Sequence, residues 1–322
     1  MEIIMGNIMS KINTAIIKQL SLSDRVNIYY IKLVGGNKTG FFALLRSVLV
    51  YMCYADETGQ LPYVEYEGDT LYLEDQPIRG TKNVYEYYFV QDLNVKKIVI
   101  PWKINLRIAH IEEFEEIEYK YNKSEFSYHV RDGYIDRMAE IYKKYIQLTA
   151  DTERYIKQAI RKKLNGRKTI GIHIRGTDFN KMFDNHPIPV NVEEYVSSIN
   201  DVYEKYHYEQ IFVATDDIRC LDLLRKQLNL PIVYYEDTAR SDSDKSVAFS
   251  KNMRKNDRYL LGLEVLRDAY TLSYCDGFIG CLSQVDIFVQ IFRKSRGRDF
   301  GYKKIINKGI SSSGKMCWEP RE

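Results

Sequence analysis

The pattern of apolar and polar residues divides the chain into two halves. Residues 26–34 are β-branched and aromatic, and they lead through the glycine-rich turn 35–40 into the apolar run 41–54. This order predicts a strand, a turn and a helix. The turn lacks the GK[ST] ending of a P-loop, which excludes an ATPase of that class. A second strand is expected at 61–66, and an unusually aromatic segment follows at 82–89.

A helical pattern over 124–164 separates the two halves. Its last turn is basic, from Arg161 to Lys163, and Gly166 follows shortly after it. Basic residues followed by glycine are typical of a helix C-terminus. We therefore expect two domains, one over 1–165 and one over 166–322.

Strands and helices alternate along the second half. The expected strands are 168–174, 210–214, 231–235 and 277–279. The expected helices are 192–206, 217–228, 259–273 and 284–293. This alternation predicts an α/β fold with a parallel, doubly wound sheet. In such sheets ligands bind beyond the carboxyl ends of the strands.

Composition limits the class of protein. A length of 322 residues suits two domains, and 45% hydrophobic with 28% charged residues is ordinary for a folded soluble protein. The net charge of +3 provides no global field that would favour nucleic acid as a partner. The five cysteines form no CxxC pair and the five histidines form no cluster at metal-ligand spacing. We expect reduced thiols and no metal site.

No segment has the pattern of a signal peptide or a membrane span. Lys11 and Lys18 interrupt the N-terminal apolar pattern, which also lacks a small-residue cleavage site. No stretch reaches the roughly 18 uninterrupted apolar residues that a span needs. Residues 3–22 fit a packed amphipathic helix, which the pattern favours, or a segment that contacts a membrane surface. We expect a cytoplasmic protein, with peripheral contact at the inner membrane surface left open.

Polar residues follow the expected strand 168–174. They are His173, Arg175 and Asp178. The planar guanidinium of Arg175 matches either the oxygens of a phosphate or the carboxylate of a structural ion pair, and the pattern favours phosphate. Asp178 is placed to orient Arg175 or to accept from a ligand hydroxyl.

Asp216 and Asp217 follow the expected strand 210–214. Paired carboxylates at a strand end bind a divalent cation, accept hydrogen bonds from a base or ribose, or cap the next helix. The metal interpretation is the weakest, because adjacent aspartates lack the intervening residue of a DxD motif. Capping and ligand contact both stay open.

The last polar group lies around the expected strand 277–279. Ser283 and Gln284 begin the following helix, whose N-terminus is a candidate phosphate cradle. Upstream, Asp268 lies in a largely apolar helix. It faces solvent, or it faces inward and needs a partner for its charge.

Taken together, these segments resemble the fucosyltransferase superfamily, most closely its α1,6-fucosyltransferase branch. The resemblance runs from residue 169 to 292 and rests on motifs in matching order and spacing. They are GIHIRGTD at 171–178, HP at 186–187, EEY at 193–195, FVATDD at 212–217 and LRDAYTLSYCDGFIGCLSQV at 266–285. The resemblance implies two Rossmann-like domains in a GT-B-like arrangement. It also implies an inverting, metal-independent transfer of fucose from GDP-fucose to a glycan or glycolipid hydroxyl, with no cofactor.

The resemblance assigns roles to individual residues. Arg175 would hold the β-phosphate of the donor, and Asp178 would support the same motif. His173 would contact the guanine or ribose, and Asp268 would accept from the donor edge of the guanine. Further donor-binding positions follow from the same match: Tyr195, Asp216, Asp217, Ser283 and Gln284.

Two positions depart from the branch. In this branch a second arginine usually follows the first, and Gly176 stands at that position. Phe179 stands where the core fucosyltransferase of the branch has a lysine. The glutamate that serves as the base there has no clear counterpart, and we assign Asp184, the nearest carboxylate, to this role. The departures keep open another GDP-sugar as the donor, or a noncatalytic nucleotide-sugar-binding protein.

The two domains receive different roles from the resemblance. Residues 166–322 would bind the nucleotide sugar, and residues 1–165 would form the acceptor side. Tyr87 and Tyr88 either stack on an acceptor sugar or fill the core. The tail 309–322 is a loose end or packs back on the first domain, and its tryptophan favours packing.

Overall fold

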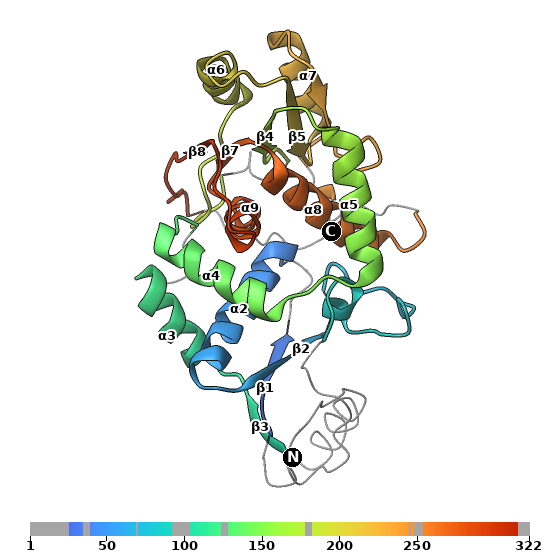
Figure 1. Cartoon of the computed structure of the whole chain (residues 1–322), viewed down its shortest axis with the longest axis vertical. Helices are drawn as coiled ribbons and strands as arrows, with labels where there is room; N and C mark the ends of the chain where they lie inside the picture. The colour runs from blue at the N-terminus through green and yellow to red at the C-terminus, as the bar shows by residue number, and fades with distance from the viewer. Residues whose placement is uncertain are drawn as a thin grey trace. The chain divides into compact units, whose positions relative to one another are not determined.

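The computed structural model describes residues 26–34, 39–68, 70–91, 104–123, 128–177, 182–244, 246–247 and 254–314. The chain forms two compact units, 1–127 with 131–152, and 128–130 with 153–322. Figure 1 shows the elements of the first unit in blue to green and those of the second in green to red. Most of α5 (Ala150–Leu164) belongs to the second unit, where Tyr155 accepts from Arg267 and Lys163 donates to Glu236.

The first unit contains a parallel sheet of three strands in the order β2-β1-β3. Its strands are β1 (Val26–Val34), β2 (Leu61–Glu67) and β3 (Ile104–Ile108). Its helices are α2 (Phe41–Glu57), α3 (Ile111–Asn122), α4 (Asp132–Tyr145) and the short 3-10 helix η1 (Val84–Tyr87). The strands expected at 26–34 and 61–66 are confirmed. Tyr87 and Tyr88 are fully buried, so they fill the core.

The second unit contains a parallel sheet of five strands in the order β6-β5-β4-β7-β8. Its strands are β4 (Thr169–Ile174), β5 (Gln210–Thr215), β6 (Ile232–Val233), β7 (Gly277–Cys281) and β8 (Tyr302–Ile306). The order reverses between β4 and β7, as in doubly wound nucleotide-binding sheets. This confirms the parallel α/β fold expected for this half. The edge strand β8 was not expected, because its lysines give YKKII no apolar pattern.

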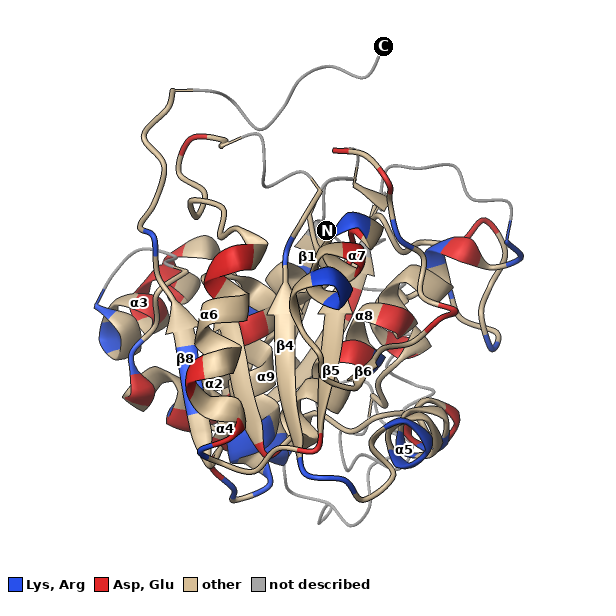
Figure 2. Cartoon of the chain, turned by 90° about the horizontal axis from the view of Figure 1, so that it is seen from above, with Lys and Arg blue, Asp and Glu red and all other residues tan. Residues whose placement is uncertain are grey.

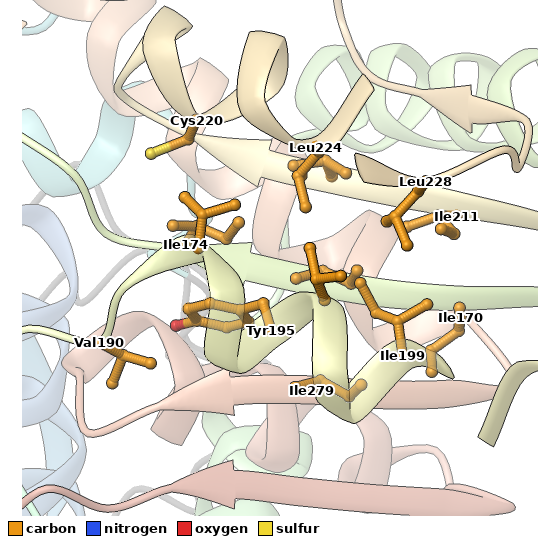
Figure 3. Packing of buried hydrophobic residues seen from close by; sticks show 14 of the residues in the cluster. Ile170, Ile174, Val190, Tyr195, Ile199, Ile211, Cys220, Leu224, Leu228 and Ile279 are labelled. Atoms are coloured by element: carbon orange, nitrogen blue, oxygen red, sulfur yellow. The ribbon is translucent and has the colours of Figure 1, made fainter. Parts of the chain in front are cut away.

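Helices cover both faces of this sheet. On one face, α6 (Val192–Tyr203) and α7 (Ile218–Gln227) bury apolar side chains against the strands. Figure 3 shows Tyr195 and Ile199 of α6 and Leu224 of α7 over the strand residues Ile170 and Ile279.

On the other face, α8 (Asp257–Tyr274) packs so closely that a Cβ on Gly171 of β4 would lie 3.0 Å from Cys275 Sγ. The helix α9 (Gln284–Ser295) stacks on α8 through Phe292 and Tyr270, with ring centroids 4.2 Å apart. Both α8 and α9 therefore belong to the same layer.

The central strands β4 and β5 of the second sheet are buried along their whole length, and their middle residues are mostly apolar. Every residue of β4 and β5 is buried, and Figure 2 shows both ribbons without Lys, Arg, Asp or Glu. Helices cover both faces of this parallel sheet. Its central strands therefore have no solvent-facing side and are rich in apolar residues. Polar residues are therefore confined to the strand ends. Among the described helices, none is both long and apolar enough to cross a bilayer.

Candidate functional site

The carboxyl ends of β4 and β7 lie side by side where the strand order reverses, which is where sheets of this kind bind ligands. Arg175 comes directly after β4, and Cys281 is the last residue of β7. Burial raises the pKa of the Cys281 thiol, and the guanidinium of Arg175 opposes this rise. The charge of Arg175 therefore lies near the ends of both strands, as a phosphate-binding role requires.

A buried histidine and carboxylate join the same two strands. His173 Nδ1 lies 2.9 Å from Asp286 Oδ1, and the two residues are 8% and 1% exposed. Asp286 also accepts from the backbone N–H of Cys281 at 3.0 Å and from the hydroxyl of Ser283 at 2.8 Å. A Cβ on Gly280 would come within 2.6 Å of Asp286 Oδ1. The Asp286 carboxylate thus fixes the orientation of the ring of His173, which the sequence predicted as a site residue.

Asp286 was not found from the sequence. The available signal is the spacing of Ser283 and Asp286, which is that of a capping box. Ser283 is the N-cap of α9, and its side chain accepts from the backbone N–H of Asp286 at 3.1 Å. The predicted Ser283 therefore shapes the helix start that would face a phosphate.

The same cluster is a group that could hold a metal ion. The ligand atoms of His173, Cys281 and Asp286 all lie within 4.8 Å of one another. However, both oxygens of Asp286 already accept hydrogen bonds, and burial raises the pKa of the Cys281 thiol. A metal would have to displace the thiol proton and these hydrogen bonds, so the arrangement favours a hydrogen-bonded cluster without a metal.

The two aspartates after β5 have separate tasks. Asp216 accepts from the backbone N–H of Gly176 at 3.0 Å and from the hydroxyl of Thr177 at 2.7 Å. It therefore holds the loop that carries Arg175. Asp217 caps α7 by accepting from the backbone N–H of Arg219 at 2.9 Å, and it also binds that guanidinium. Direct contact of either aspartate with a donor stays a prediction, and Asp178 lies outside the described residues.

Gly176 passes too close to Asp217 to carry a side chain. A Cβ built on it would lie 2.3 Å from Asp217 Cβ, well inside van der Waals contact. The structure therefore gives a steric reason why no second arginine follows Arg175.

We expect Gly176→Ala to destabilise the protein by about 1–3 kcal/mol, because the new methyl group must displace Asp217 from the cap of α7. Gly133→Ala is the matched control, since a Cβ there meets nothing within 4 Å. Urea unfolding measures both variants. Equal stability of the two would contradict the steric interpretation.

Buried polar atoms without hydrogen-bond partners mark a second part of the site. Within the described part of the chain, they include Asp268 Oδ1 and both amide atoms of Gln284. Such an atom costs roughly 1–3 kcal/mol, so native proteins keep few of them. Both residues are donor-binding positions predicted from the sequence. A bound ligand would supply the missing partners.

Asp268 faces inward from α8, so it is not the solvent-facing residue that the sequence left as an alternative. It is 8% exposed, and its nearest cation is Arg267, with Nε 3.9 Å from Oδ1. Burial raises the pKa of Asp268 to about 6, against the opposing charges of Arg267 and Arg240.

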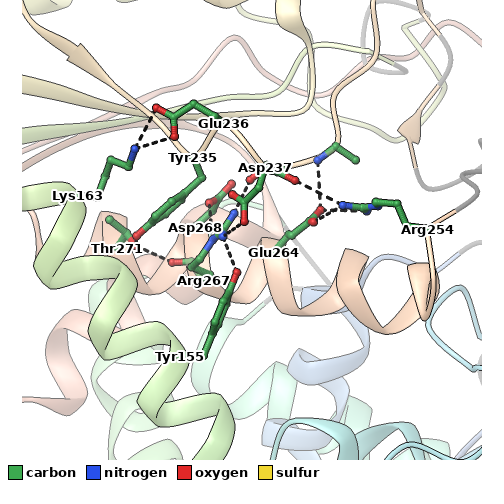
Figure 4. A network of polar contacts seen from close by, with 12 residues as sticks. Tyr155, Lys163, Tyr235, Glu236, Asp237, Arg254, Glu264, Arg267, Asp268 and Thr271 are labelled. Atoms are coloured by element: carbon green, nitrogen blue, oxygen red, sulfur yellow. Dashed lines mark hydrogen bonds and ion pairs between the residues drawn. The ribbon is translucent and has the colours of Figure 1, made fainter.

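Arg267 makes hydrogen bonds that hold several residues in place near Asp268. It donates to Tyr155 Oη at 2.5 Å, to Asp237 Oδ2 at 2.9 Å and to Thr238 Oγ1 at 2.7 Å. Its guanidinium also lies 3.8 Å from the centroid of the Tyr235 ring. Figure 4 shows this network between α5, α8 and the segment that follows β6.

Of the other two predicted residues, Tyr195 lies beside the His173 cluster and Asp184 lies elsewhere. Tyr195 of α6 is fully buried, and burial raises the pKa of its hydroxyl, with the neighbouring Cys281 and Asp286 adding to the rise. Asp184 accepts from the backbone N–H of Gly314 at 3.1 Å and from the Asn185 amide at 3.0 Å. Their roles as donor contact and base stay predictions.

The beginning of the tail pairs with its own unit. Pro187 and Ile310 form an antiparallel bridge, and Ser311 exchanges backbone hydrogen bonds with Asn185 and His186. Residues 315–322, which include Trp318, lie outside the described residues.

A cavity of about 320 Å³ lies in the first unit, between the end of α2 and the start of β2. It contains none of the predicted donor-binding residues. Because it opens at the amino end of β2, it lies at the edge of a sheet where α/β proteins do not usually bind nucleotides.

Comparison with known proteins gives a match at the level of fold. No family model matches the sequence, and no curated protein matches it. A structure of NodZ α1,6-fucosyltransferase soaked with GDP-fucose has 14% identity and a TM-score of 0.53, and the match covers 83% of this chain and 93% of that one. The fucosyltransferase NodZ from Bradyrhizobium gives 15% identity, a TM-score of 0.50 and coverage of 84% and 93%. The chain therefore has an α/β fold similar to that of NodZ.

Proposed function

We propose that this protein is an inverting, metal-independent glycosyltransferase that moves fucose from GDP-fucose to a hydroxyl of a glycan or glycolipid. The proposal rests on residues at the carboxyl ends of the neighbouring strands β4 and β7. There, Arg175 follows β4 and Gln284 begins the helix after β7, and in the described part of the chain the Gln284 amide makes no hydrogen bond. NodZ, which shares the fold, has been solved with GDP-fucose and with GDP.

In the proposed reaction the acceptor hydroxyl attacks C1 of fucose on the face opposite the diphosphate. The new C–O bond forms as the bond between C1 and the diphosphate oxygen breaks, and GDP leaves with the electron pair. Negative charge grows on the leaving diphosphate, where Arg175 and the N-terminus of α9 stabilise it. The hydroxyl proton passes to a carboxylate, for which we propose Asp184.

Asp184→Asn is expected to lower the transfer rate by about 10²–10⁴-fold, the usual contribution of a general base. GDP affinity should not change, because the asparagine oxygen still accepts from Gly314. Transfer rate and calorimetric GDP affinity are measured together. Wild-type turnover in the variant would remove Asp184 from the mechanism.

Calorimetric titration of the EDTA-treated protein with GDP, GDP-fucose, GDP-mannose and UDP tests the proposal. We expect metal-free binding of GDP and GDP-fucose. If the protein prefers GDP-mannose, the fold assignment stands and the proposed donor changes from GDP-fucose to GDP-mannose. Absence of nucleotide binding by folded protein would overturn the proposal.

A second candidate is a noncatalytic protein that binds a nucleotide sugar. It is favoured by one observation, the engagement of both Asp184 oxygens with Gly314 and Asn185. The two candidates differ in chemistry. A transferase releases GDP from GDP-fucose when an acceptor is present, whereas the binding protein retains the intact sugar nucleotide.

The remaining parts of the proposal concern partners and place. We assign the acceptor to the first unit and the GDP-sugar to the second, without a nucleic-acid partner. We place the protein in the cytoplasm, with contact at the inner membrane surface where the acceptor is a glycolipid.

A further inference from the structure

The second unit contains a half-buried arginine, Arg240, that the proposed donor contacts do not use. Arg240 donates from Nη1 to the backbone oxygens of Tyr235 at 2.9 Å and Thr238 at 3.2 Å. Its Nε and Nη2 are buried and make no hydrogen bond in the part of the chain that the structure describes. These two nitrogens form one side of the guanidinium, and their N–H bonds point in the same direction. Arg240 thus keeps an intact bidentate donor edge.

The surroundings fix Arg240 near Asp268. The guanidinium lies 4.9 Å from the centroid of the Tyr234 ring. Burial lowers the pKa of Arg240, and the charge of Asp268 opposes this shift. Among the described contacts, however, no hydrogen bond or ion pair joins the two side chains. A pair of donors and an unused acceptor, Asp268 Oδ1, therefore stand near each other without satisfying each other.

The backbone places this pair at the ligand-binding edge of the sheet. Ser241, the next residue, donates its backbone N–H to Asp216 O at 2.8 Å and accepts from the backbone N–H of Ile218 at 3.0 Å. The segment after β6 therefore returns to the carboxyl end of β5. A ligand that binds beyond the strand ends meets Arg240 there.

We propose that Arg240 recognises the guanine ring of the donor by donating from Nε and Nη2 to O6 and N7, while Asp268 accepts from N1–H and the 2-amino group. The inference rests on the proposed function, because it requires a GDP-sugar. Two adjacent acceptors on one ring edge are what an arginine fork matches, and guanine presents them as O6 and N7. Adenine presents an amino group in place of O6, so Arg240 would reject it.

Calorimetry with base analogues tests this assignment on the wild-type protein. In 7-deaza-GDP a C–H replaces N7, while O6, N1–H and the 2-amino group remain. We expect it to bind on the order of 10- to 100-fold more weakly than GDP, the usual loss when a bidentate base contact is broken. IDP lacks only the 2-amino group and should also bind more weakly, through Asp268.

Arg240→Met separates the two contacts. The variant should bind GDP and 7-deaza-GDP equally, and it should still prefer GDP to IDP. Arg240→Lys, which keeps the charge and loses the fork, should also lose the preference for GDP over 7-deaza-GDP. A thermal unfolding scan checks that both variants are folded, and the wild-type comparison needs no variant.

Two outcomes would overturn the inference. In the first, the wild-type protein binds GDP and 7-deaza-GDP equally. In the second, Arg240→Met keeps the preference for GDP over 7-deaza-GDP, and an equal weakening of both nucleotides would then assign Arg240 to the diphosphate. In each case GDP still binds and the proposed function stands. Failure of the wild-type protein to bind any guanine nucleotide would overturn both.

Discussion

Replacing Arg175 with alanine is expected to lower kcat/KM for transfer from GDP-fucose by about 10³-fold. The guanidinium forms charge-assisted hydrogen bonds to the diphosphate, and they strengthen as the leaving group gains charge. Removing one donor that stabilises such charge typically costs 10²–10³-fold, and the loss of a full charge places Arg175 at the upper end. The loop is preorganised for this role, because Asp216 holds Gly176 and Thr177 directly after it.

Steady-state kinetics with varied GDP-fucose measure this effect, and calorimetry measures GDP affinity in parallel. Arg175→Lys should be intermediate, because it keeps the charge and loses the planar fork. Arg298→Ala is the matched control, since this arginine is exposed between α9 and β8. If Arg175→Ala weakens GDP binding and leaves kcat unchanged, Arg175 holds the ground state only.

The sequence predicted most of the second unit because its central strands are short, mostly apolar runs. All six residues of β4 and all six of β5 are buried, so neither strand has a solvent-facing side that would alternate polar with apolar residues. Each of these strands also ends at polar residues. The positions of His173, Arg175 and Asp216 near the carboxyl edge therefore followed from the order of the elements.

Two of the four edge strands, β3 and β8, were missed for a physical reason. The edge strand β8 contains Lys303 and Lys304, and β3 contains Asn105 and Arg107. Polar side chains on an edge strand point to solvent and remove the apolar run. The compact units divide at residue 152, whereas the sequence places the boundary at 165 because the basic end of α5 and Gly166 mark the end of that helix.

Residues of the site were missed where partners are distant in sequence. Asp286 meets His173 across the switch point, and Arg240 approaches Asp268 from the segment after β6. The two residues of each pair are far apart in the sequence, so no local sequence pattern indicates either contact. Only the folded sheet shows that the carboxylate of Asp268 is buried and that Nε and Nη2 of Arg240 make no hydrogen bond to the described residues.

Asp268 is expected to make both stability and GDP affinity depend on pH. Burial raises its pKa from the ordinary 3.8 to about 6 in the folded protein. A folded-state pKa above the unfolded one means that the protonated form favours folding. This contribution is fully present below pH 4 and is lost as the pH rises through 6. Each pH unit between the two values corresponds to about 1.4 kcal/mol, so ionised Asp268 costs the folded state about 3 kcal/mol at pH 7.

Asp268→Asn removes the ionisation and keeps the size of the side chain. Urea unfolding should therefore show the variant to be more stable than the wild-type protein at pH 7, by up to about 3 kcal/mol, and equally stable at pH 4. A stability difference that does not change between these pH values would contradict the assignment.

The same substitution should weaken GDP binding at pH 7, because the ionised carboxylate is the form that accepts from both guanine donors. Wild-type affinity should rise between pH 5 and 7, partly because the β-phosphate of GDP also titrates there. That phosphate contribution persists in Asp268→Asn, so the difference between the two proteins isolates the carboxylate. A variant that gains stability and loses the guanine contact would show that the protein tolerates a costly buried charge because its ligand requires it. Equal GDP affinity of the two proteins at pH 7 would mean that the charge of Asp268 serves the arginines around it and not the donor.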